Sequence, residues 1–247
     1  MREVFNQFFD FRTARPYLTL LLEGFWVTLQ IALLAEGICL ALGLVLAVMR
    51  RFRPDPFGRP WPARVGAAVV RGVAVVYINV FRGLPALLVL LIMFASFPFL
   101  PIPVIKSLSE FQIGFIGLGL VYAAYVAEVY RAGIDSVEWG QTEAARSLGM
   151  SNLQALRLVV LPQAVRRVLP PLMNDFIALS KDVALVSVIA VNDVVYQARA
   201  AQAETFNATV LTIAGLFYLV FTLPLIWVLD RLIDREQRRT SRGSAVT

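Results

Sequence analysis

Histidine is absent from the 247-residue sequence, cysteine occurs once, at Cys39, and lysine occurs twice. A single cysteine excludes a disulfide within the chain. Without histidine, sites for zinc or haem and Cys–His nucleophiles have almost no ligands or partners, so we expect no catalytic and no metal-binding residues. Charge is scarce too: Asp, Glu, Lys and Arg make up 16% of the chain, against about 25% in a typical soluble domain.

Apolar residues dominate what remains. They make up 58% of the chain, against about 45–50% on average, and the mean hydropathy is +0.70. A soluble globule needs more polar surface, and a disordered chain has more charge and fewer apolar residues. The composition therefore indicates an integral membrane protein.

Long apolar runs define the expected fold. A helix crosses a bilayer with about 20 apolar residues. The sequence predicts five crossings, at residues 25–49, 83–99, 111–129, 172–191 and 208–229. Six crossings remain open, because residues 67–80 could cross separately. We expect an all-α, polytopic transmembrane helix bundle that forms one domain over residues 1–247.

The basic residues are distributed unevenly between the expected connections. Seventeen of the 23 lysines and arginines lie in residues 50–82 and 131–167 and in the tail after Asp230, and five lie in the remaining connections. Basic loops stay on the cytoplasmic side of a membrane. The net charge of +6 therefore reflects membrane topology rather than nucleic-acid binding, and we expect the N-terminus outside and the C-terminus in the cytoplasm.

The connection at residues 131–171 has the pattern of a helix–turn–helix. Residues 142–148 are mostly good helix formers, and Gly149 can adopt the left-handed conformation that ends a helix. Ser151 and Gln154 have the spacing of a capping box, and Pro162 is expected to end the second helix. By itself, this unit is either an ordinary folded loop or a docking element for a cytoplasmic partner.

This connection also carries a recognisable motif. In order, it contains Glu143-Ala144-Ala145, Gly149 and Val159-x-Leu161-Pro162. The residues and their spacing resemble the EAA loop of ABC-importer permeases. Further stretches are similar to the polar amino acid uptake branch of that family, at residues 77–85, 127–151, 161–182 and 187–191. The resemblance covers about residues 19–238.

The resemblance implies a transmembrane subunit of an ATP-driven importer in the bacterial inner (plasma) membrane. Such a subunit forms half of a translocation pathway for a polar amino acid or a related small zwitterion and works by alternating access. The implied partners are a cytoplasmic ABC ATPase dimer, a second permease subunit (identical or homologous), an extracytoplasmic solute-binding protein and membrane lipid. The chain itself would be no enzyme and hold no cofactor.

ATP and Mg would then be held by the ATPase subunits. The sequence agrees, because neither of its two lysines follows a glycine, as the phosphate-binding loop requires. The resemblance further implies that six residues of the loop couple to the ATPase: Glu143, Ala144, Ala145, Gly149, Leu161 and Pro162. Of these, Glu143 would make polar contacts, the alanines would allow close approach, and Gly149 would set the turn.

Polar and ionisable residues within or beside the apolar runs are candidates for the substrate path, because a charge at membrane depth is costly. They are Asn79, Arg82, Glu128, Lys181 and Asp182. Each has a structural alternative: Glu128 can pair with Arg131 at i+3, Arg82 can mark a helix break, and the others can bond between helices. Successive helix residues point about 100° apart, so Lys181 and Asp182 should face different neighbours.

Two further sets of polar residues have two interpretations each. Glu36 in the first expected crossing either forms an inter-helix hydrogen bond or faces a partner or the path, and Cys39 is expected to fill the core. Asp193, Gln197 and Glu204 are expected on the outer side, where they either belong to an ordinary solvated loop or meet the binding protein.

The solute and some rival functions stay open. The family usually has Thr-Ser where this chain has Val183-Ala184, so opines, ectoine-like solutes and other polar amines are possible solutes. An ion-coupled secondary transporter of a small polar solute is the main alternative, although five crossings without an inverted repeat argue against it. A membrane enzyme is a second alternative, which Ser180 and Lys181 support poorly as sequence neighbours.

Overall fold

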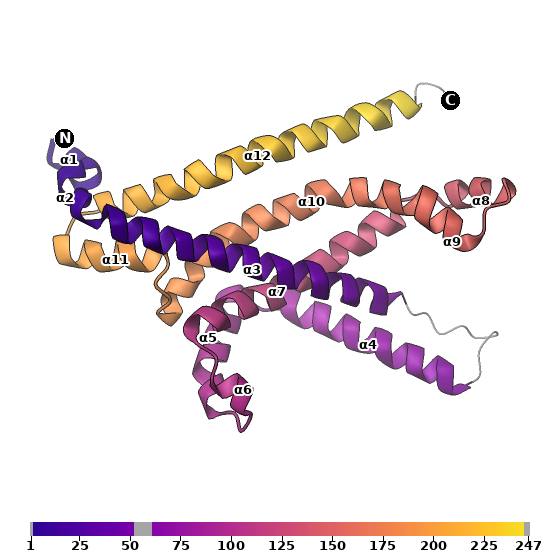
Figure 1. The fold of residues 1–247 in the computed structure, drawn as a ribbon, viewed down its shortest axis with the longest axis horizontal. Coiled ribbons are helices and arrows are strands. Elements are labelled where there is room, and N and C mark those ends of the chain that lie inside the picture. The colour runs from indigo at the N-terminus through magenta and orange to yellow at the C-terminus, as the bar shows by residue number, and fades with distance from the viewer. Residues whose placement is uncertain (1, 52–60, 245–247) are drawn as a thin grey trace. The chain divides into compact units, whose positions relative to one another are not determined.

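The fold comes from a computed structural model of the chain, which describes residues 2–51 and 61–244 and the side chains of residues 6–51 and 61–235. All regular structure in these residues is helical (Figure 1), which confirms the all-α prediction. The N-terminal half contains α1 (Arg2–Phe9), α2 (Phe11–Ala14), η1 (Arg15–Tyr17), α3 (Leu18–Arg50), α4 (Trp61–Gly83), α5 (Ala86–Ser96), η2 (Phe97–Phe99) and α6 (Pro103–Lys106). The C-terminal half contains α7 (Glu110–Asp135), α8 (Trp139–Ser147), α9 (Asn152–Ala155), η3 (Leu156–Val160), α10 (Leu161–Asp182), η4 (Val183–Ile189), α11 (Val194–Thr205) and α12 (Thr209–Ser244).

Four helical segments among the described residues are long and apolar enough to cross a membrane. They are Asn6–Arg50, Trp61–Gly83, Glu110–Asp135 and Thr209–Arg235. The first and third predicted crossings lie within α3 and α7, and the fifth lies within α12 except for Ala208. The region around the second is divided into α4 and the shorter apolar helix Ala86–Phe99.

The predicted crossing at residues 172–191 is not one continuous α-helix. The α-helix α10 ends at Asp182, and the 3-10 helix η4 follows it. Because α10 carries Arg166, Arg167 and Asp175, it is less apolar than the four long segments. The apolar run in the sequence therefore combines the end of one helix with a second helix of different geometry.

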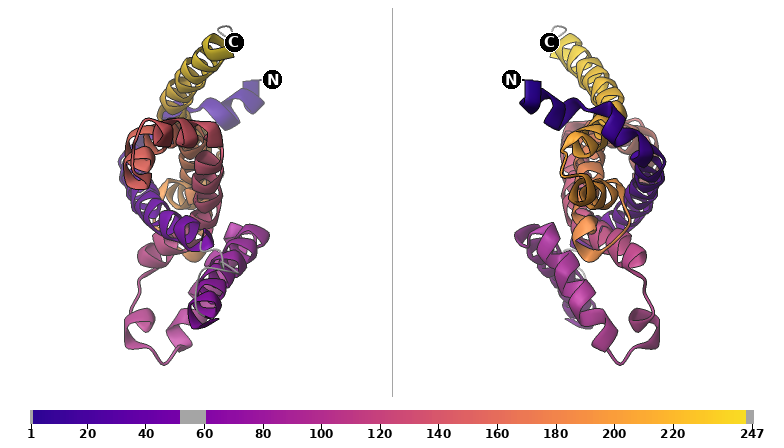
Figure 2. Two further views of the ribbon diagram at one scale, coloured as in Figure 1. Left: turned by 90° about the vertical axis from the view of Figure 1, so that its right-hand side faces the viewer. Right: turned by 90° about the vertical axis from the view of Figure 1, so that its left-hand side faces the viewer.

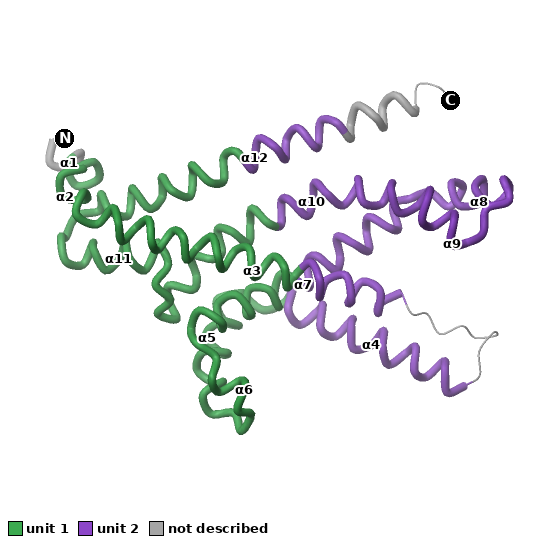
Figure 3. The backbone as a smooth tube through the Cα atoms, in the orientation of Figure 1, with its two compact units in different colours: residues 1–39, 83–122, 176–224 green, residues 40–82, 123–175, 225–247 purple. Residues whose placement is uncertain are grey.

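Residue contacts divide the chain into two compact units (Figure 3). Unit 1 comprises residues 1–39, 83–122 and 176–224, and unit 2 comprises residues 40–82, 123–175 and 225–247. The helices α3, α7, α10 and α12 contribute to both units.

Unit 1 has a core where the N-terminal helices meet α11 and α12. The buried side chains are Ala14, Leu21, Val194, Ala198, Ala201, Val210, Ile213 and Ala214. The N-terminal helices lie beside the turn between α11 and α12 (Figures 1 and 2), where the Gln7 side chain donates to the carbonyl of Phe206. Phe25 adds ring contacts to Phe217 and Tyr218.

Glycines let helices approach closely in both units. In unit 1, a Cβ on Gly119 of α7 would lie 2.8 Å from the Ile38 side chain of α3. In unit 2, a Cβ on Gly133 of α7 would lie 2.0 Å from the Val168 side chain of α10. Both distances are shorter than side-chain carbons tolerate, so glycine is needed at both places.

The helix–turn–helix predicted within residues 131–171, called the EAA loop below, is present. The first helix, α8, ends before Gly149, which adopts the left-handed conformation with φ +84°. Ser151 and Gln154 form the predicted capping box at the start of α9. Both local predictions are confirmed.

The prediction that Pro162 ends the second helix is wrong. The π-helix η3 follows α9, and α10 begins at Leu161 and continues past Pro162, Pro170 and Pro171. Pro162 lacks the backbone N–H that the interior of a regular α-helix uses. The π-turn just before it shifts the backbone ladder, so that the amide of Leu161 donates to the carbonyl of Leu156.

Candidate functional site

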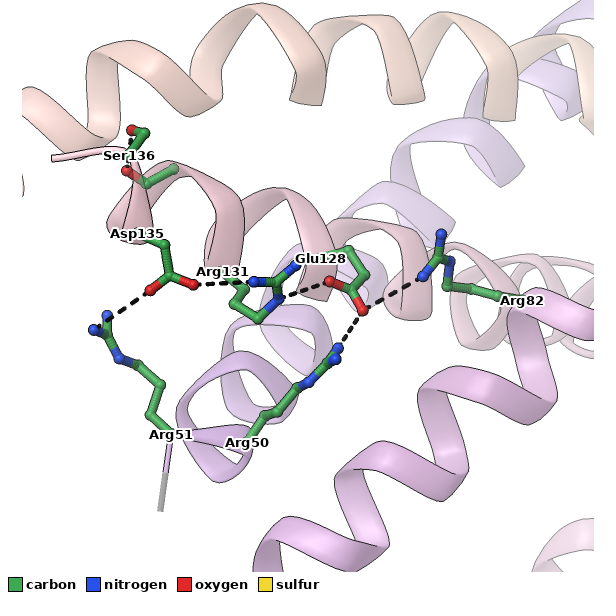
Figure 4. A network of polar contacts seen from close by, with 8 residues as sticks. Arg50, Arg51, Arg82, Glu128, Arg131, Asp135 and Ser136 are labelled. Carbon is green, nitrogen blue, oxygen red and sulfur yellow. Dashed lines mark hydrogen bonds and ion pairs between the residues drawn. The ribbon is translucent and has the colours of Figure 1, made fainter. Parts of the chain in front are cut away.

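A network of ion pairs surrounds Glu128 of α7 in unit 2 (Figure 4). Nε of Arg131 donates to Glu128 Oε2 at 2.8 Å, which confirms the predicted i,i+3 pair. Arg50, the last residue of α3, donates to Oε1 of the same carboxylate. Arg82 of α4 approaches Oε1 at 3.4 Å. One carboxylate, whose side chain is only 18% exposed, therefore holds guanidinium groups from three helices.

Asp135 extends this network at the end of α7. It accepts a hydrogen bond from Arg131 at 3.0 Å and lies 3.7 Å from Arg51. Four arginines thus face two carboxylates, and the network carries two positive charges in excess. Of the substrate-path candidates, the structure brings Arg82 and Glu128 together, while Asn79 lies exposed on α4 outside this network.

Arg82 sits next to the break between α4 and α5. Its side chain is 45% exposed, and its guanidinium carbon lies 5.8 Å from the centre of the Tyr125 ring. The following residues, Leu84 and Pro85, are not part of either helix, as expected from proline, which disfavours helix in the residue before it. The guanidinium group of Arg82 is therefore partly exposed to solvent and makes a cation–π contact with Tyr125.

Lys181 and Asp182 face different surroundings, as predicted. In unit 1, the hydroxyl of Tyr122 donates to Asp182 Oδ2 at 2.9 Å. The Lys181 side chain is exposed and makes no ion pair with any residue that the structure describes. Asp182 therefore links α7 and α10, whereas Lys181 is exposed.

Two other acidic residues in helices, Glu36 and Asp175, differ in the hydrogen bonds that their side chains accept. The thiol of the buried Cys39 donates to Glu36 Oε2 at 3.3 Å, one turn along the same helix. The predicted inter-helix bond of Glu36 stays a prediction, whereas Cys39 is buried, as expected. Asp175 was not singled out in the sequence, yet its buried Oδ2 has no hydrogen-bond partner within the described residues.

The expectation of a solvated loop around Asp193 is wrong. Asp193 is fully buried in unit 1 and accepts hydrogen bonds from the amides of Val195 and Tyr196, which caps α11. Its own carbonyl oxygen would lie 2.8 Å from a Cβ on Gly24. Glu204 accepts a hydrogen bond from Tyr17 at 2.9 Å. The sequence signal for this cap is the aspartate itself, because aspartate is a preferred residue at the N-cap of a helix.

Burial also changes the acidity of Asp193, which lies between η4 and α11 and outside the helices long enough to cross a membrane. Burial raises the pKa of Asp193 to about 6, and the hydrogen bonds from Tyr196 and Val195 oppose this rise. Desolvation penalises the charged form of a carboxyl. The cap is therefore held in a site that favours the protonated acid.

The EAA loop presents apolar side chains and a fixed carboxylate. Trp139, Leu148 and Leu153 are 73%, 81% and 72% exposed. The indole N–H of Trp139 donates to Glu143 Oε1 at 2.7 Å, one turn along α8. Trp139 was not among the predicted coupling residues, although a tryptophan four residues before the motif glutamate is a readable signal for such a contact.

The structure places the six predicted coupling residues in different environments. Glu143, Ala144, Leu161 and Pro162 are exposed, and Gly149 makes the turn. Ala145 is 4% exposed and packs inside the chain, so its small side chain fits an internal contact rather than an outer surface. Arg167 of α10 donates to the carbonyl of Ser136, which fixes the loop to the end of α7.

Metal-binding geometry is not found in the residues that the structure describes, where no three acidic, histidine or cysteine side chains come together to hold an ion.

Comparison with known proteins identifies the family of the chain. Residues 61–239 match the family described as binding-protein-dependent transport system inner membrane component. The arginine transport system permease protein ArtQ of Bacillus subtilis (strain 168) is 36% identical over 92% of this chain and 96% of ArtQ. The glutamine transport system permease protein GlnP of Escherichia coli (strain K12) is 34% identical over 92% of this chain and 97% of GlnP.

Two solved structures share the fold. The crystal structure of an amino acid ABC transporter with histidines is 34% identical, covers 89% of this chain and 95% of its own chain, and has a TM-score of 0.76. The inward-facing MetNI methionine ABC transporter has a TM-score of 0.70 at 20% identity, which shows the fold alone. The chain therefore belongs to the binding-protein-dependent transport system inner membrane components, as the multi-pass permease component of an ABC transporter.

Proposed function

We propose that the chain forms half of the pathway through which an ATP-driven importer moves a polar amino acid or related small zwitterion across the inner membrane. The observation that carries this proposal is the nearly full-length similarity to permeases named for arginine and glutamine transport. The fold of an amino acid ABC transporter supports it. Transport by alternating access needs a second permease subunit and a solute-binding protein at the outer face.

ATP hydrolysis is expected on a separate ATPase dimer that docks on the EAA loop. The exposed apolar side chains of Trp139, Leu148 and Leu153 form a contact surface of the kind that becomes buried when two proteins bind. The contact from Trp139 orients the carboxylate of Glu143 before any partner binds. ATP and Mg would be held by the ATPase, and this chain would transmit the movement.

The polar groups of α4, α7 and α10 are proposed to border the solute path. In unit 2, Arg82 with Glu128 supplies both signs of charge, and in unit 1 so does Lys181 with Asp182; a zwitterion carries both signs. Asn79, exposed on α4, would contribute a neutral donor and acceptor. Asp175 joins these candidates, because its buried Oδ2 has no hydrogen-bond partner within the described residues and it lies in the crossing predicted at residues 172–191, where an ionisable residue marks a functional site by default.

Co-purification and uptake test this proposal together. The tagged chain, extracted from its native membrane, should bring an ATPase in equal amount, and the complex with its binding protein in liposomes should take up an amino acid only with ATP. Trp139→Phe removes the indole N–H and should weaken ATPase retention several-fold, as should Glu143→Lys. Trp61→Phe is the matched control, since Trp61 is also 73% exposed. ATP-independent transport by the lone chain would contradict the proposal.

A further inference from the structure

The three guanidinium groups on Glu128 are not held equally. Arg131 is bound at 2.8 Å and has a second carboxylate, Asp135, at 3.0 Å. Arg50 is in direct contact with Oε1. Arg82 lies 3.4 Å from Oε1 and makes no second ion pair with the described residues. Of the three guanidinium groups on Glu128, that of Arg82 is therefore the most loosely held.

Arg82 is also free to accept another partner. Its side chain is 45% exposed, against 26% for Arg50 and 38% for Arg131. Figure 4 shows Arg82 approaching the carboxylate from a different side than Arg131. A guanidinium carries five N–H groups in a planar fork that matches a carboxylate, and a single long contact leaves most of these donors unused.

We propose that Arg82 binds the carboxylate of the transported amino acid, and that Glu128 is the carboxylate on which Arg82 rests when no solute is present. This inference rests on the proposed function. A solute carboxylate replaces Glu128 at Arg82, while Glu128 keeps Arg50 and Arg131. The exchange swaps one anion for another, so no guanidinium or carboxylate is left buried without a counter-charge, which is the expensive event in such networks.

The exchange also has a mechanical consequence within unit 2. The contact between Arg82 and Glu128 is an ion pair that joins α4 to α7. Solute binding would release this pair and leave the pairs of α3 with α7 in place. Solute at Arg82 would thereby loosen α4 from its neighbour, which ties occupation of the site to a helix movement.

Direct binding to the purified permease–ATPase complex tests the inference. Each of the twenty amino acids is titrated calorimetrically in the absence of the binding protein, and the amide of each one that binds is titrated next. The amide lacks the charged carboxylate, so the wild type should bind it about 10- to 100-fold more weakly, as for loss of a charge-assisted hydrogen bond. Binding of no amino acid, or equal binding of acid and amide, overturns the proposal.

Two variants separate recognition from folding. In Arg82→Gln the affinity for the amino acid should fall to that for its amide, and Arg82→Lys should lie between. Arg51→Gln is the control, because Arg51 is 49% exposed and pairs only loosely, at 3.7 Å, with Asp135. A structural role of Arg82 would lower the melting temperature and leave the acid-to-amide ratio unchanged, which would contradict the proposal.

ATP-driven uptake in liposomes with the binding protein distinguishes a failure of the proposed function from a failure of the role of Arg82. If the wild type takes up no amino acid, the proposed function fails, and the inference fails with it. If the wild type takes up an amino acid and Arg82→Gln does so with the same KM and the same selectivity against the amide, only the role of Arg82 fails. The expected result is a KM raised at least 10-fold in Arg82→Gln and unchanged in Arg51→Gln.

Discussion

At the scale of single residues, Glu128 holds together a network of ion pairs. Its carboxylate neutralises guanidinium groups from α3, α4 and α7. Removing the charge on one partner leaves the other partners of a partly buried pair uncompensated. The consequence of a substitution therefore depends on how many partners the residue holds and how deeply they are buried.

Glu128→Gln should lower the stability of the chain by roughly 2 kcal/mol, because three guanidinium groups lose their shared charge-assisted acceptor. Asp135→Asn is the control: its side chain is 49% exposed, and exposed ion pairs contribute about 0–1 kcal/mol. Thermal unfolding in detergent, followed by circular dichroism, compares the two. A smaller loss in Glu128→Gln than in Asp135→Asn would mean that the network is not structural.

Asp193 should give the chain a pH-dependent stability. Its pKa rises to about 6 on folding, so the folded state binds the proton more tightly than the unfolded state, whose Asp pKa is about 3.9. Stability from this group is present at low pH and falls as the pH rises from about 4 to 6.

Melting temperatures of the wild type and Asp193→Asn between pH 4.5 and 7.5 check this prediction. Asparagine keeps an oxygen for the helix cap but does not titrate. The stability of the wild type relative to the variant should decrease as the pH rises through this range. A difference that stays constant with pH would show that Asp193 keeps one protonation state throughout.

At the scale of elements, the packing of α3 on α7 depends on small residues. A Cβ on Gly119 would meet the side chain of Ile38 at 2.8 Å and the carbonyl of Ala35 at 3.2 Å. Backbone cannot move aside as a flexible side chain can. The two helices would have to separate to admit even a methyl group, and small residues commonly allow such contacts between helices in membranes.

Gly119→Ala should therefore destabilise the chain, and Gly37→Ala should not. A Cβ on Gly37 of α3 meets no atom within 4 Å, and alanine in a helix interior is more favourable than glycine by about 1 kcal/mol. Heat-induced loss of the folded monomer, measured by fluorescence-detected size exclusion, compares the variants. Equal melting temperatures for both would contradict the close contact.

Local sequence signals predicted the elements of the EAA loop well where the physics is local. The left-handed Gly149 and the capping box of Ser151 depend on neighbours within a few residues. The continuation of the helix past Pro162 depends on the π-turn before it, and the alternation of turn types along a backbone is not visible in residue identities. The crossing predicted at residues 172–191 failed as one helix for a similar reason, since apolar content does not distinguish α from 3-10 geometry.

At the scale of the whole molecule, the family match decides between the two classes of transporter that the sequence left open. Buried charges alone are compatible with an ion-coupled carrier. Membership in the binding-protein-dependent permeases identifies an ABC transporter component. Its orientation in the membrane stays a prediction from the uneven distribution of arginines, which is a property of the entire chain.

The N-terminus should lie outside and the C-terminus in the cytoplasm. In a Cys39→Ala background, Glu3→Cys should react with a membrane-impermeant maleimide added to spheroplasts, and Thr247→Cys should react only after the membrane is opened. The physical reason is that basic segments are retained on the cytoplasmic side. Labelling of Thr247→Cys in closed spheroplasts would reverse the assigned topology.

The sequence by itself determined the membrane character, the helical architecture and the presence of the EAA motif, because hydropathy, charge distribution and spacing act along the chain. The i,i+3 pair of Glu128 with Arg131 also follows from helical period. Only the tertiary structure decided which distant residues meet: Arg50 and Arg82 at Glu128, Tyr122 at Asp182, and Asp193 in the core instead of in solvent. The pair of Arg50 with Glu128, for example, joins residues 78 positions apart, and the packing of helices, not local pattern, brings them together.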